Sequence, residues 1–488
     1  MIDNGQLILA AEDCEESQFS SLHCFTDYEE RIIKSLMAHG PVLLRGGRGS
    51  GKSALLIEAS RRIRDKLPDA LPVYLSLRHL PLLQSSGSEY QNFFSNLVAG
   101  AVNSSLEKSN INTRIIANLN SSNIRSELVE LAQSINRRIV LIFDDAAHIG
   151  RETDLGDFFG LFRTISGNNV SCKAAIYPGV TKFGKRFDVY SDATVIDLSR
   201  DERSPSFSKF FSEMTKTRYP KMHEKFSKTI TSKQDDIYHF LGRSVLGNAR
   251  SYVFACNILN ENTSIGLNEI TDCLTKLSAD YYWPLLEELK PKLGIYESLL
   301  EPSQQIAEIV FDFLADKQAT SALIHRDYQQ RLLKIFEILE YVGFISKREA
   351  SRSLRSGGRG VRYASNLCTL LEKSPHRRVT QDVFQNWISE KEEVAEIHST
   401  NNILNIEIPL PDESKSMSIL GMNIDRLKQG KTYPYGLTEH KLHILKNAGI
   451  NTIADLAKIS DADLLQIPLI GDRTLLRVKN TVLQAIWM

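Results

Sequence analysis

One short glycine-rich stretch carries the clearest chemistry in this sequence. It reads Gly46-Gly47-Arg48-Gly49-Ser50-Gly51-Lys52-Ser53. Glycines at this spacing let successive backbone N–H groups turn inward around a phosphate group. Lys52 then supplies a cation for the β- and γ-phosphates, and the Ser53 hydroxyl is a ligand for Mg²⁺. The pattern predicts a nucleoside triphosphate site, and we expect ATP and Mg²⁺ as its cofactors.

The flanking residues predict the elements that position this loop. An apolar run at 41–44 precedes it, as expected of a buried strand, and residues 54–59 follow with a helical pattern. Strand, loop and helix in this order place the phosphate at a helix N-terminus, where the helix dipole favours negative charge. The expected nucleotide-binding residues of the loop are Gly46, Gly47, Gly49, Ser50, Gly51, Lys52, Ser53 and Ala54.

A second motif lies about a hundred residues further along the chain. The apolar run at 139–143 ends in Asp144 and Asp145. A continuous apolar run is typical of a strand buried on both faces of a parallel sheet. At its carboxyl end we expect Asp144 to share the Mg²⁺ with Ser53, and Asp145 to orient or deprotonate the attacking water. Lys52, Asp144 and Asp145 are therefore the predicted catalytic residues.

Composition bounds the remaining possibilities. The 488 residues predict about three domains, and the net charge of zero means that any nucleic-acid surface must be local. The sequence has no apolar run long enough to span a bilayer and no basic leader, so we expect no membrane partner. The six cysteines are scattered without a C-x-x-C pair, which indicates a reducing cytoplasm and no zinc site.

A further short motif, Gly247-Asn248-Ala249-Arg250, completes a family resemblance. Residues 20–280 resemble an AAA+ ATPase of the origin-recognition and Cdc6-like type, and also the related STAND ATPases. The resemblance implies that Arg250 opens the sensor 2 helix of a helical lid and contacts the γ-phosphate. The family carries Asp-Glu where this chain has Asp144-Asp145, and the shorter Asp145 implies that hydrolysis can be slow.

The same resemblance implies two more roles in the nucleotide site. Sensor 1 should follow the strand at 172–177, with Tyr177 and Thr181 as the candidates. The arginine finger, which completes the site of a neighbouring subunit, should precede the strand at 193–198. Arg186 is the first choice for it, with Lys185 and Arg200 as alternatives, and it implies a homo-oligomer.

Residues 302–372 predict a different module. Two amphipathic helices, at 303–314 and 329–339, precede a β-hairpin whose turn is the glycine-rich stretch 356–360. This order predicts a winged helix, as in the origin-recognition and Cdc6 proteins. The hairpin is strongly basic, so we expect its arginines to contact the phosphates of duplex DNA, although a solvated loop or a subunit contact is the alternative. The candidates are Arg348, Arg352, Arg355, Arg359 and Arg362.

The C-terminal segment has two copies of a helix–turn–helix pattern, at 436–457 and 464–479. They resemble tandem helix-hairpin-helix motifs, in which backbone N–H groups of the hairpin bind one DNA phosphate. Leu469 stands where that hairpin has its first glycine, but Arg473 and Arg477 remain candidates for DNA contact. A small helical module that docks protein is an equal alternative.

Together these features predict an α/β P-loop NTPase, a parallel sheet flanked by helices, with a helical lid, a winged-helix domain and a small all-α C-terminal domain. The expected boundaries are 1–200, 201–295, 296–375, a linker at 376–432 with one strand at 403–408, and 433–488. We expect a cytoplasmic, DNA-binding ATPase that assembles on DNA and controls an effector protein: a nuclease, transposase or helicase in replication, mobile-element or antiviral defence. The alternative is a STAND-type signalling switch whose C-terminal modules bind protein.

Overall fold

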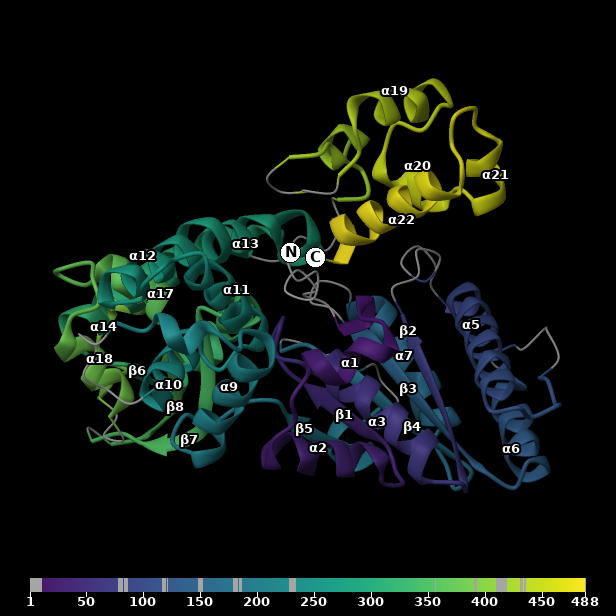
Figure 1. Cartoon of the computed structure of the whole chain (residues 1–488), viewed down its shortest axis with the longest axis horizontal. Coiled ribbons are helices and arrows are strands. Elements are labelled where there is room, and N and C mark those ends of the chain that lie inside the picture. Colours follow the sequence, from purple (N-terminus) through teal and green to yellow (C-terminus); the bar gives the residue numbers. More distant parts are fainter. Residues whose placement is uncertain are drawn as a thin grey trace.

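A computed structural model describes residues 11–487, except 78–81, 83–86, 116–119, 121, 148–151, 179–182, 184–186, 228–233, 356, 390–392, 410–418, 431–432 and 434–435. Figure 1 shows three parts: a sheet covered by helices, a mixed helical and β part beside it, and a small helical part formed by the C-terminus. Among the described residues, no helix is both long and apolar enough to cross a membrane.

The first part is a five-stranded, all-parallel sheet in the order β2-β3-β4-β1-β5. Its strands are β1 (Val42–Arg45), β2 (Ala70–Ser76), β3 (Arg138–Ala147), β4 (Val170–Ile176) and β5 (Thr194–Asp197). Its helices are α1 (Glu16–Leu22), α2 (Asp27–Met37), α3 (Lys52–Lys66), α5 (Gly87–Lys108), α6 (Ile124–Ser134), α7 (Glu152–Ile165) and the short α8 (Val189–Asp192).

Alternation along the strands explains why the apolar runs are continuous. Leu141 and Phe143 of β3 pack with α5, α6 and α7, whereas Val140 and Ile142 pack with α2 and α3. Successive side chains of a strand point to opposite faces, so a sheet with helices on both faces needs apolar residues at every position. The loop from β1 to α3 carries the phosphate-binding motif, and the predicted α/β core, a parallel sheet flanked by helices, is confirmed.

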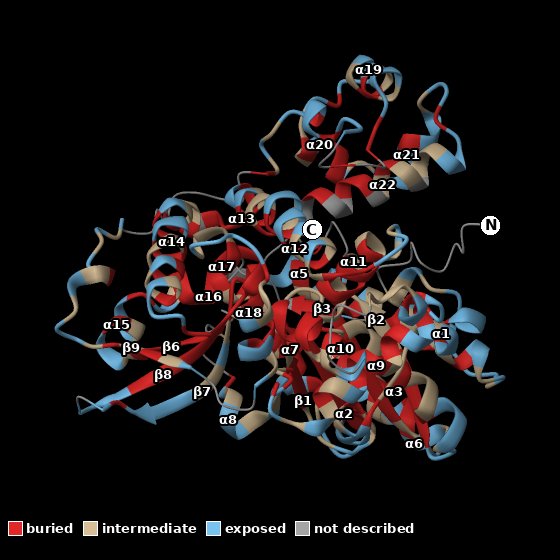
Figure 2. Cartoon of the chain, turned by 60° about the vertical axis from the view of Figure 1, so that its left-hand side comes forward, coloured by how far each residue is buried: buried red, intermediate tan, exposed pale blue. Residues whose placement is uncertain are grey.

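The second part begins with a helical lid and continues into a hairpin domain. The lid helices are α9 (Pro205–Arg218), α10 (Gln234–Ser244), α11 (Ala249–Asn260), α12 (Leu267–Leu277) and α13 (Trp283–Glu288). The hairpin domain has α14 (Leu300–Asp316), β6 (Ser321–His325), α15 (Arg326–Arg331), α16 (Leu333–Val342), β7 (Ile345–Ser353), β8 (Arg359–Ser365), α17 (Leu367–Lys373), α18 (Gln381–Ile388) and β9 (Val394–Ile397). One hydrophobic core runs through both, which Figure 2 shows as buried segments from α10 to α18.

The hairpin domain has the predicted order of helices followed by an antiparallel hairpin. Its sheet runs β7-β8-β6-β9, with β8 between two neighbours and β9 parallel to β6. The prediction of a strand at 403–408 is wrong, because a 3₁₀ turn, Asn402–Leu404, lies there. The strand of this segment is β9, which ends before that turn. Trp387 and Ile397 lie in the shared core, so the first half of the segment predicted as a linker packs within this domain.

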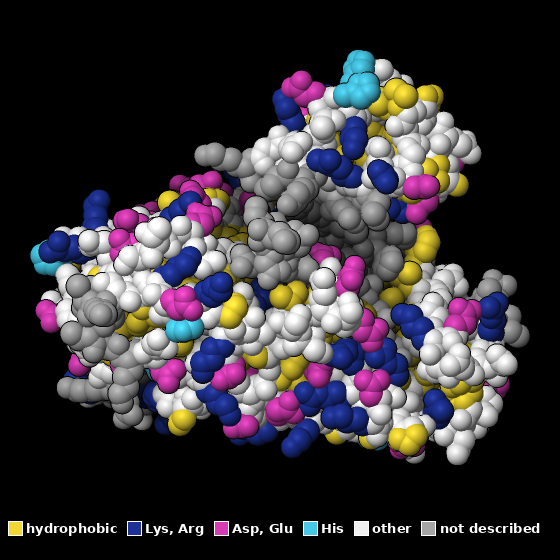
Figure 3. Space-filling model, viewed as in Figure 1, with side chains coloured by type: hydrophobic (Ala, Val, Ile, Leu, Met, Phe, Trp, Pro, Cys, Tyr) yellow, Lys and Arg dark blue, Asp and Glu magenta, His cyan; other side chains and the backbone are white. Residues whose placement is uncertain are grey.

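The C-terminal part has a separate core. Its helices are α19 (Glu439–Asn447), α20 (Ile453–Lys458), α21 (Asp461–Gln466) and α22 (Asp472–Trp487). Thr438, Thr452 and Ser460 begin three of these helices, and each side-chain oxygen accepts a hydrogen bond from a backbone N–H of the first turn. The part is small and all-helical, as expected. Over the face shown in Figure 3, basic and acidic side chains are interspersed, as the zero net charge suggests.

Candidate nucleotide site and basic hairpin

The phosphate-binding loop is a tight turn that glycine makes possible. Gly49 and Gly51 have φ of +76° and +99°, in the left-handed region that other residues rarely adopt. Lys52 is the first residue of α3, and its Nζ donates to the carbonyl oxygens of Gly46 (2.8 Å) and Gly47 (3.0 Å). The same ammonium lies 3.7 Å from the centre of the Tyr177 ring, a cation–π contact. The ammonium of Lys52 therefore lies against the loop backbone, beside N–H groups at the N-terminus of α3.

The predicted metal ligands lie together. The Ser53 hydroxyl lies beside the Asp144 carboxylate and favours its charged form, although these residues are far apart in the sequence. The Tyr74 hydroxyl donates to Asp144 Oδ2 at 2.7 Å. Burial, and then the negative charge of Asp145, raise the pKa of Asp144 to about 7. A serine hydroxyl and a buried carboxylate with a raised pKa, beside a phosphate loop, fit a Mg²⁺ ion, which would stabilise the carboxylate charge.

Asp145 has an unusual backbone conformation. It has φ of +53° and is buried, and its own N–H donates to Asp144 Oδ1 at 2.9 Å. The Tyr177 hydroxyl donates to Asp145 Oδ1 at 3.4 Å. A non-glycine residue held at positive φ stores backbone strain, which is typical of functional sites. Tyr177, one of the two sensor 1 candidates, thus contacts both Lys52 and Asp145. Thr181, the other candidate, lies outside the described residues.

The lid contacts the loop through the predicted sensor 2 motif. Asn248 caps α11, and its Nδ2 donates to the carbonyl oxygen of Arg48 at 2.6 Å. The backbone N–H of Arg250 donates to Gly49 O at 3.1 Å. A Cβ atom at Gly49 would lie 2.6 Å from Arg250 Cβ and from Asn248 Oδ1, so only glycine permits this close approach.

A pocket lies between the loop, the N-terminal helices and the lid. Gly49, Gly51, Lys52, Ser53, Ala54 and Arg250 line it. Its other lining residues include His23, Phe25, Phe210, Met214 and Val253, which are mainly apolar or aromatic. The pocket thus combines polar groups at the loop with an apolar wall, which suits a phosphate joined to a planar base. The sequence reasoning did not identify this wall, because its residues come from separate segments of the chain and share no motif.

Arg200 is placed differently from the arginine-finger alternative considered above. It is buried within its own subunit, where its Nε donates to Glu29 Oε1 at 2.9 Å. That alternative is therefore wrong, because a buried guanidinium cannot reach the site of a neighbouring subunit. Arg186 and Lys185 lie outside the described residues. Arg200 instead lines the pocket of its own subunit. Its position just after β5 is the sequence signal for this placement, since ligand sites of parallel sheets lie at the carboxyl ends of the strands.

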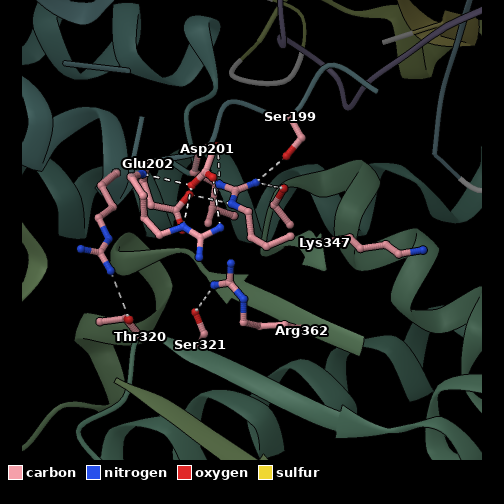
Figure 4. Close-up of polar contacts among 12 residues, drawn as sticks. Ser199, Asp201, Glu202, Thr320, Ser321, Lys347 and Arg362 are labelled. Carbon is pink, nitrogen blue, oxygen red and sulfur yellow. Dashed lines mark hydrogen bonds and ion pairs between the residues drawn. The ribbon is translucent and has the colours of Figure 1, made fainter. Parts of the chain in front are cut away.

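Two arginines of the hairpin are buried and do not belong to an exposed basic surface. Arg348 Nε donates to Glu202 Oε2 at 2.7 Å, and each side chain is 4% exposed. Arg362 is fully buried in the central strand β8 and donates to Glu349 Oε1 at 2.9 Å. Figure 4 shows Arg362 directed at Ser321. The acids Asp201 and Glu202 belong to the same polar cluster, whereas Lys347 points away from it. The DNA-contact predictions for Arg348 and Arg362 are therefore wrong.

The other predicted DNA-contacting arginines remain at or near the surface. Arg352, Arg355 and Arg359 are exposed at the outer end of the hairpin, and Arg473 is exposed near the start of α22. Arg477 is half-buried and donates to the carbonyl oxygen of Gly436 at 3.1 Å. Leu469, at the position of the missing glycine, has φ of +71° and is 76% exposed.

The helix before the hairpin is not a free surface. Most of α16 is buried, and the ring centroids of Tyr341 and Tyr177 are 5.1 Å apart. A Cβ atom at Gly47 would lie 3.4 Å from the carbonyl oxygen of Glu340. The hairpin domain thus packs directly against the phosphate-binding loop.

Comparison with known proteins gives a family match over the C-terminal helices. The family model of the C-terminal domain of the bacterial RNA polymerase alpha subunit matches residues 436–484. No curated protein matches this sequence. Cdc6p from Pyrobaculum aerophilum is a similar solved structure, with 15% identity, coverage of 77% of this chain and 98% of that one, and a TM-score of 0.33.

Two Aeropyrum pernix structures are also similar. ORC1 protein in complex with DNA has 13% identity, coverage of 79% and 95%, and a TM-score of 0.31. ORC2 protein has 10% identity, coverage of 74% and 93%, and a TM-score of 0.34. At TM-scores this low the likenesses carry no weight for function, which must come from the geometry of this protein itself.

Proposed function

We propose that this protein is an ATP-binding, Mg²⁺-dependent ATPase that binds duplex DNA, assembles as a homo-oligomer and controls an effector protein. The observation that carries the nucleotide site is the proximity of Ser53 to Asp144, beside the loop that holds Lys52. Two motifs far apart in the sequence meet at one point, as phosphate and metal binding require. The bound Mg²⁺ would neutralise charge on the phosphates.

Each residue of the site has a proposed role. Backbone N–H groups from Gly47 to Ala54 bind the phosphates, and Lys52 leaves its two carbonyl partners to bind the β- and γ-phosphates. Ser53 and Asp144 hold the metal, and Asp145 orients the attacking water. Arg250 contacts the γ-phosphate from the lid, and Arg186 of a neighbouring subunit completes the site.

We expect Asp145→Asn to retain ATP binding and to lose turnover by roughly 100-fold or more, the usual contribution of a positioned acid or base. The amide keeps the shape of the side chain but is a far weaker proton acceptor. Phosphate release under single-turnover conditions, with the dissociation constant for ATP measured in parallel, tests this role. Equal turnover in the variant and the parent would exclude it.

For DNA, we propose that the hairpin of a winged helix contacts the phosphate backbone. Because α16 is buried, the support for DNA contact lies in the exposed Arg352, Arg355 and Arg359. Such contacts supply affinity without reading the bases. The C-terminal helices, through Arg473 and Arg477, are a second proposed DNA contact.

A salt series tests the hairpin. With the triple variant R352A/R355A/R359A, the slope of log affinity against log salt should become shallower by roughly 0.9 for each phosphate that the hairpin no longer neutralises. The matched control is R31A/R64A/R114A, which removes three exposed arginines from the part formed by the parallel sheet and its helices. This variant should leave the slope unchanged. Fluorescence anisotropy of a labelled random duplex measures both. If both variants behave alike, the hairpin is not the DNA surface.

One observation favours the alternative, a STAND-type switch whose C-terminal module binds protein. Leu465 and Leu469 are exposed at 41% and 76%, and Asp461, Asp463 and Asp472 lie at the start of the adjoining helices α21 and α22. Exposed leucines among acids suit a protein partner better than a phosphate backbone. Absence of DNA binding at low salt by the unaltered protein would favour this alternative.

A further inference from the structure

Arg200 joins three segments at the edge of the nucleotide pocket. It follows β5, and its Nε is paired with Glu29 of α2. Its Nη1 donates to the carbonyl oxygens of Ser50, in the loop, at 3.1 Å and of Gly247, in the lid, at 3.2 Å. The guanidinium carbon lies 4.0 Å from the centre of the Phe210 ring. The Arg200 guanidinium therefore contacts α2 beside the parallel sheet, the phosphate-binding loop and the lid.

Glu29 holds this guanidinium in place. Its side chain and that of Arg200 are 2% and 5% exposed, so water does not compete for either. The second carboxylate oxygen, Oε2, accepts from the backbone N–H of Thr26 at 3.1 Å and from the Thr26 hydroxyl. Because both carboxylate oxygens are used, the pair has little freedom to rotate.

The remaining nitrogen of Arg200 faces the pocket. Nη2 carries two N–H donors, and it makes no hydrogen bond to any of the described residues. It lies 3.8 Å from the place that a Cβ atom would occupy on Gly51, and Arg200 lines the same pocket as Gly51, Lys52 and Ser53. Guanidinium N–H groups directed into a pocket beside a phosphate loop are well suited to a phosphate oxygen.

We propose that Arg200 is a nucleotide-binding residue whose Nη2 donates to the diphosphate part of the nucleotide. The inference rests on the proposed ATP site. The loop backbone around Gly51 surrounds the α- and β-phosphates in this motif, so Arg200 contacts the part that ATP and ADP share. Its contact is thus distinct from that proposed for Arg250, which binds the γ-phosphate. Arg200 also connects nucleotide binding to the lid through Gly247.

Titrations with ATP, ADP and adenosine test this contact. We expect R200M to weaken ATP and ADP by the same factor, roughly 10- to 100-fold, as for loss of a charge-assisted hydrogen bond. Adenosine should bind as before, since it has no phosphate. R200K retains a positive charge to pair with Glu29 but has no nitrogen in the place of Nη2. It should therefore weaken ATP and ADP equally and leave adenosine binding unchanged, even if R200M folds poorly. Equal losses for adenosine and ADP, or none for either, would overturn the proposal.

Two further variants separate this role from stability and from the γ-phosphate. R348M removes another buried arginine that bonds to the lid, at Leu246 O, but lies outside the pocket lining. It should lower the melting temperature and leave ADP affinity unchanged. R250M should weaken ATP more than ADP. If K52A abolishes ATP binding while R200M and R200K bind ADP normally, only the present inference fails. If K52A binds ATP normally, the proposed ATP site fails.

Discussion

Lys52→Ala should weaken ATP binding by at least about 100-fold, since each charge-assisted hydrogen bond contributes roughly 1.5–3 kcal/mol and about 1.4 kcal/mol is a factor of ten. The ammonium of Lys52 lies at the loop mouth, 2.8 Å from Gly46 O and 3.7 Å from the Tyr177 ring centre. Both are weaker partners for a cation than a phosphate oxygen, so ATP should displace them. Calorimetric titration measures the loss.

The control for this variant is Lys66→Ala, at the exposed end of the same helix. It removes the same charge from α3 but lies at the opposite end of the helix from the loop, so ATP affinity should stay unchanged. An equal ATP affinity in K52A and K66A would contradict the assignment of the phosphate site. A loss in both would indicate a general electrostatic effect.

The second large effect should come from the buried pair of Arg348 and Glu202. Arg348→Met leaves the carboxylate of Glu202 buried without its cation, which typically costs about 3–5 kcal/mol. Burial tends to raise the pKa of Glu202, but the Arg348 charge prevails and the pKa lies below its ordinary value. The pair's contribution is therefore complete at neutral pH and is lost as the pH falls through the folded-state pKa. Urea unfolding monitored by circular dichroism measures it.

Two variants make this result specific. Arg352→Met removes an exposed arginine of the same hairpin, 3.7 Å from Glu349, and should cost less than about 1 kcal/mol. The double variant E202L/R348M removes both buried charges and should recover most of the stability that R348M alone loses. If R348M and R352M destabilise the protein equally, the ion pair does not anchor the hairpin domain.

The nucleotide loop could be predicted because its information is local. Eight consecutive residues, flanked by a strand and a helix, determine both the glycine turn and the position of Lys52. The contact of Ser53 with Asp144 could also be predicted, because parallel strands bring their carboxyl ends to the same edge of the sheet.

The hairpin arginines could not be sorted in the same way. Residues 347–362 form one basic cluster in the sequence, but the structure separates them by their partners. Glu202, which neutralises Arg348, lies 146 positions earlier, and Arg362 is buried because β8 is a central strand. β9 was missed for a similar reason: four residues form a strand there only because β6 is available as a parallel neighbour. Long-range pairing of this kind leaves no local pattern.

The core shared by the lid and the hairpin domain has a mechanical consequence. Tyr252 of α11, Tyr341 of α16 and Trp387 of α18 belong to one close-packed interior, and such interiors transmit displacement instead of absorbing it. A rotation of α11 about the phosphate loop must therefore carry the hairpin with it. Arg250, in the first turn of α11, contacts Gly49, and Arg359 is exposed at the start of β8, so such a rotation would displace both residues together. The shared core thus couples the position of α11 at the loop to the position of the hairpin.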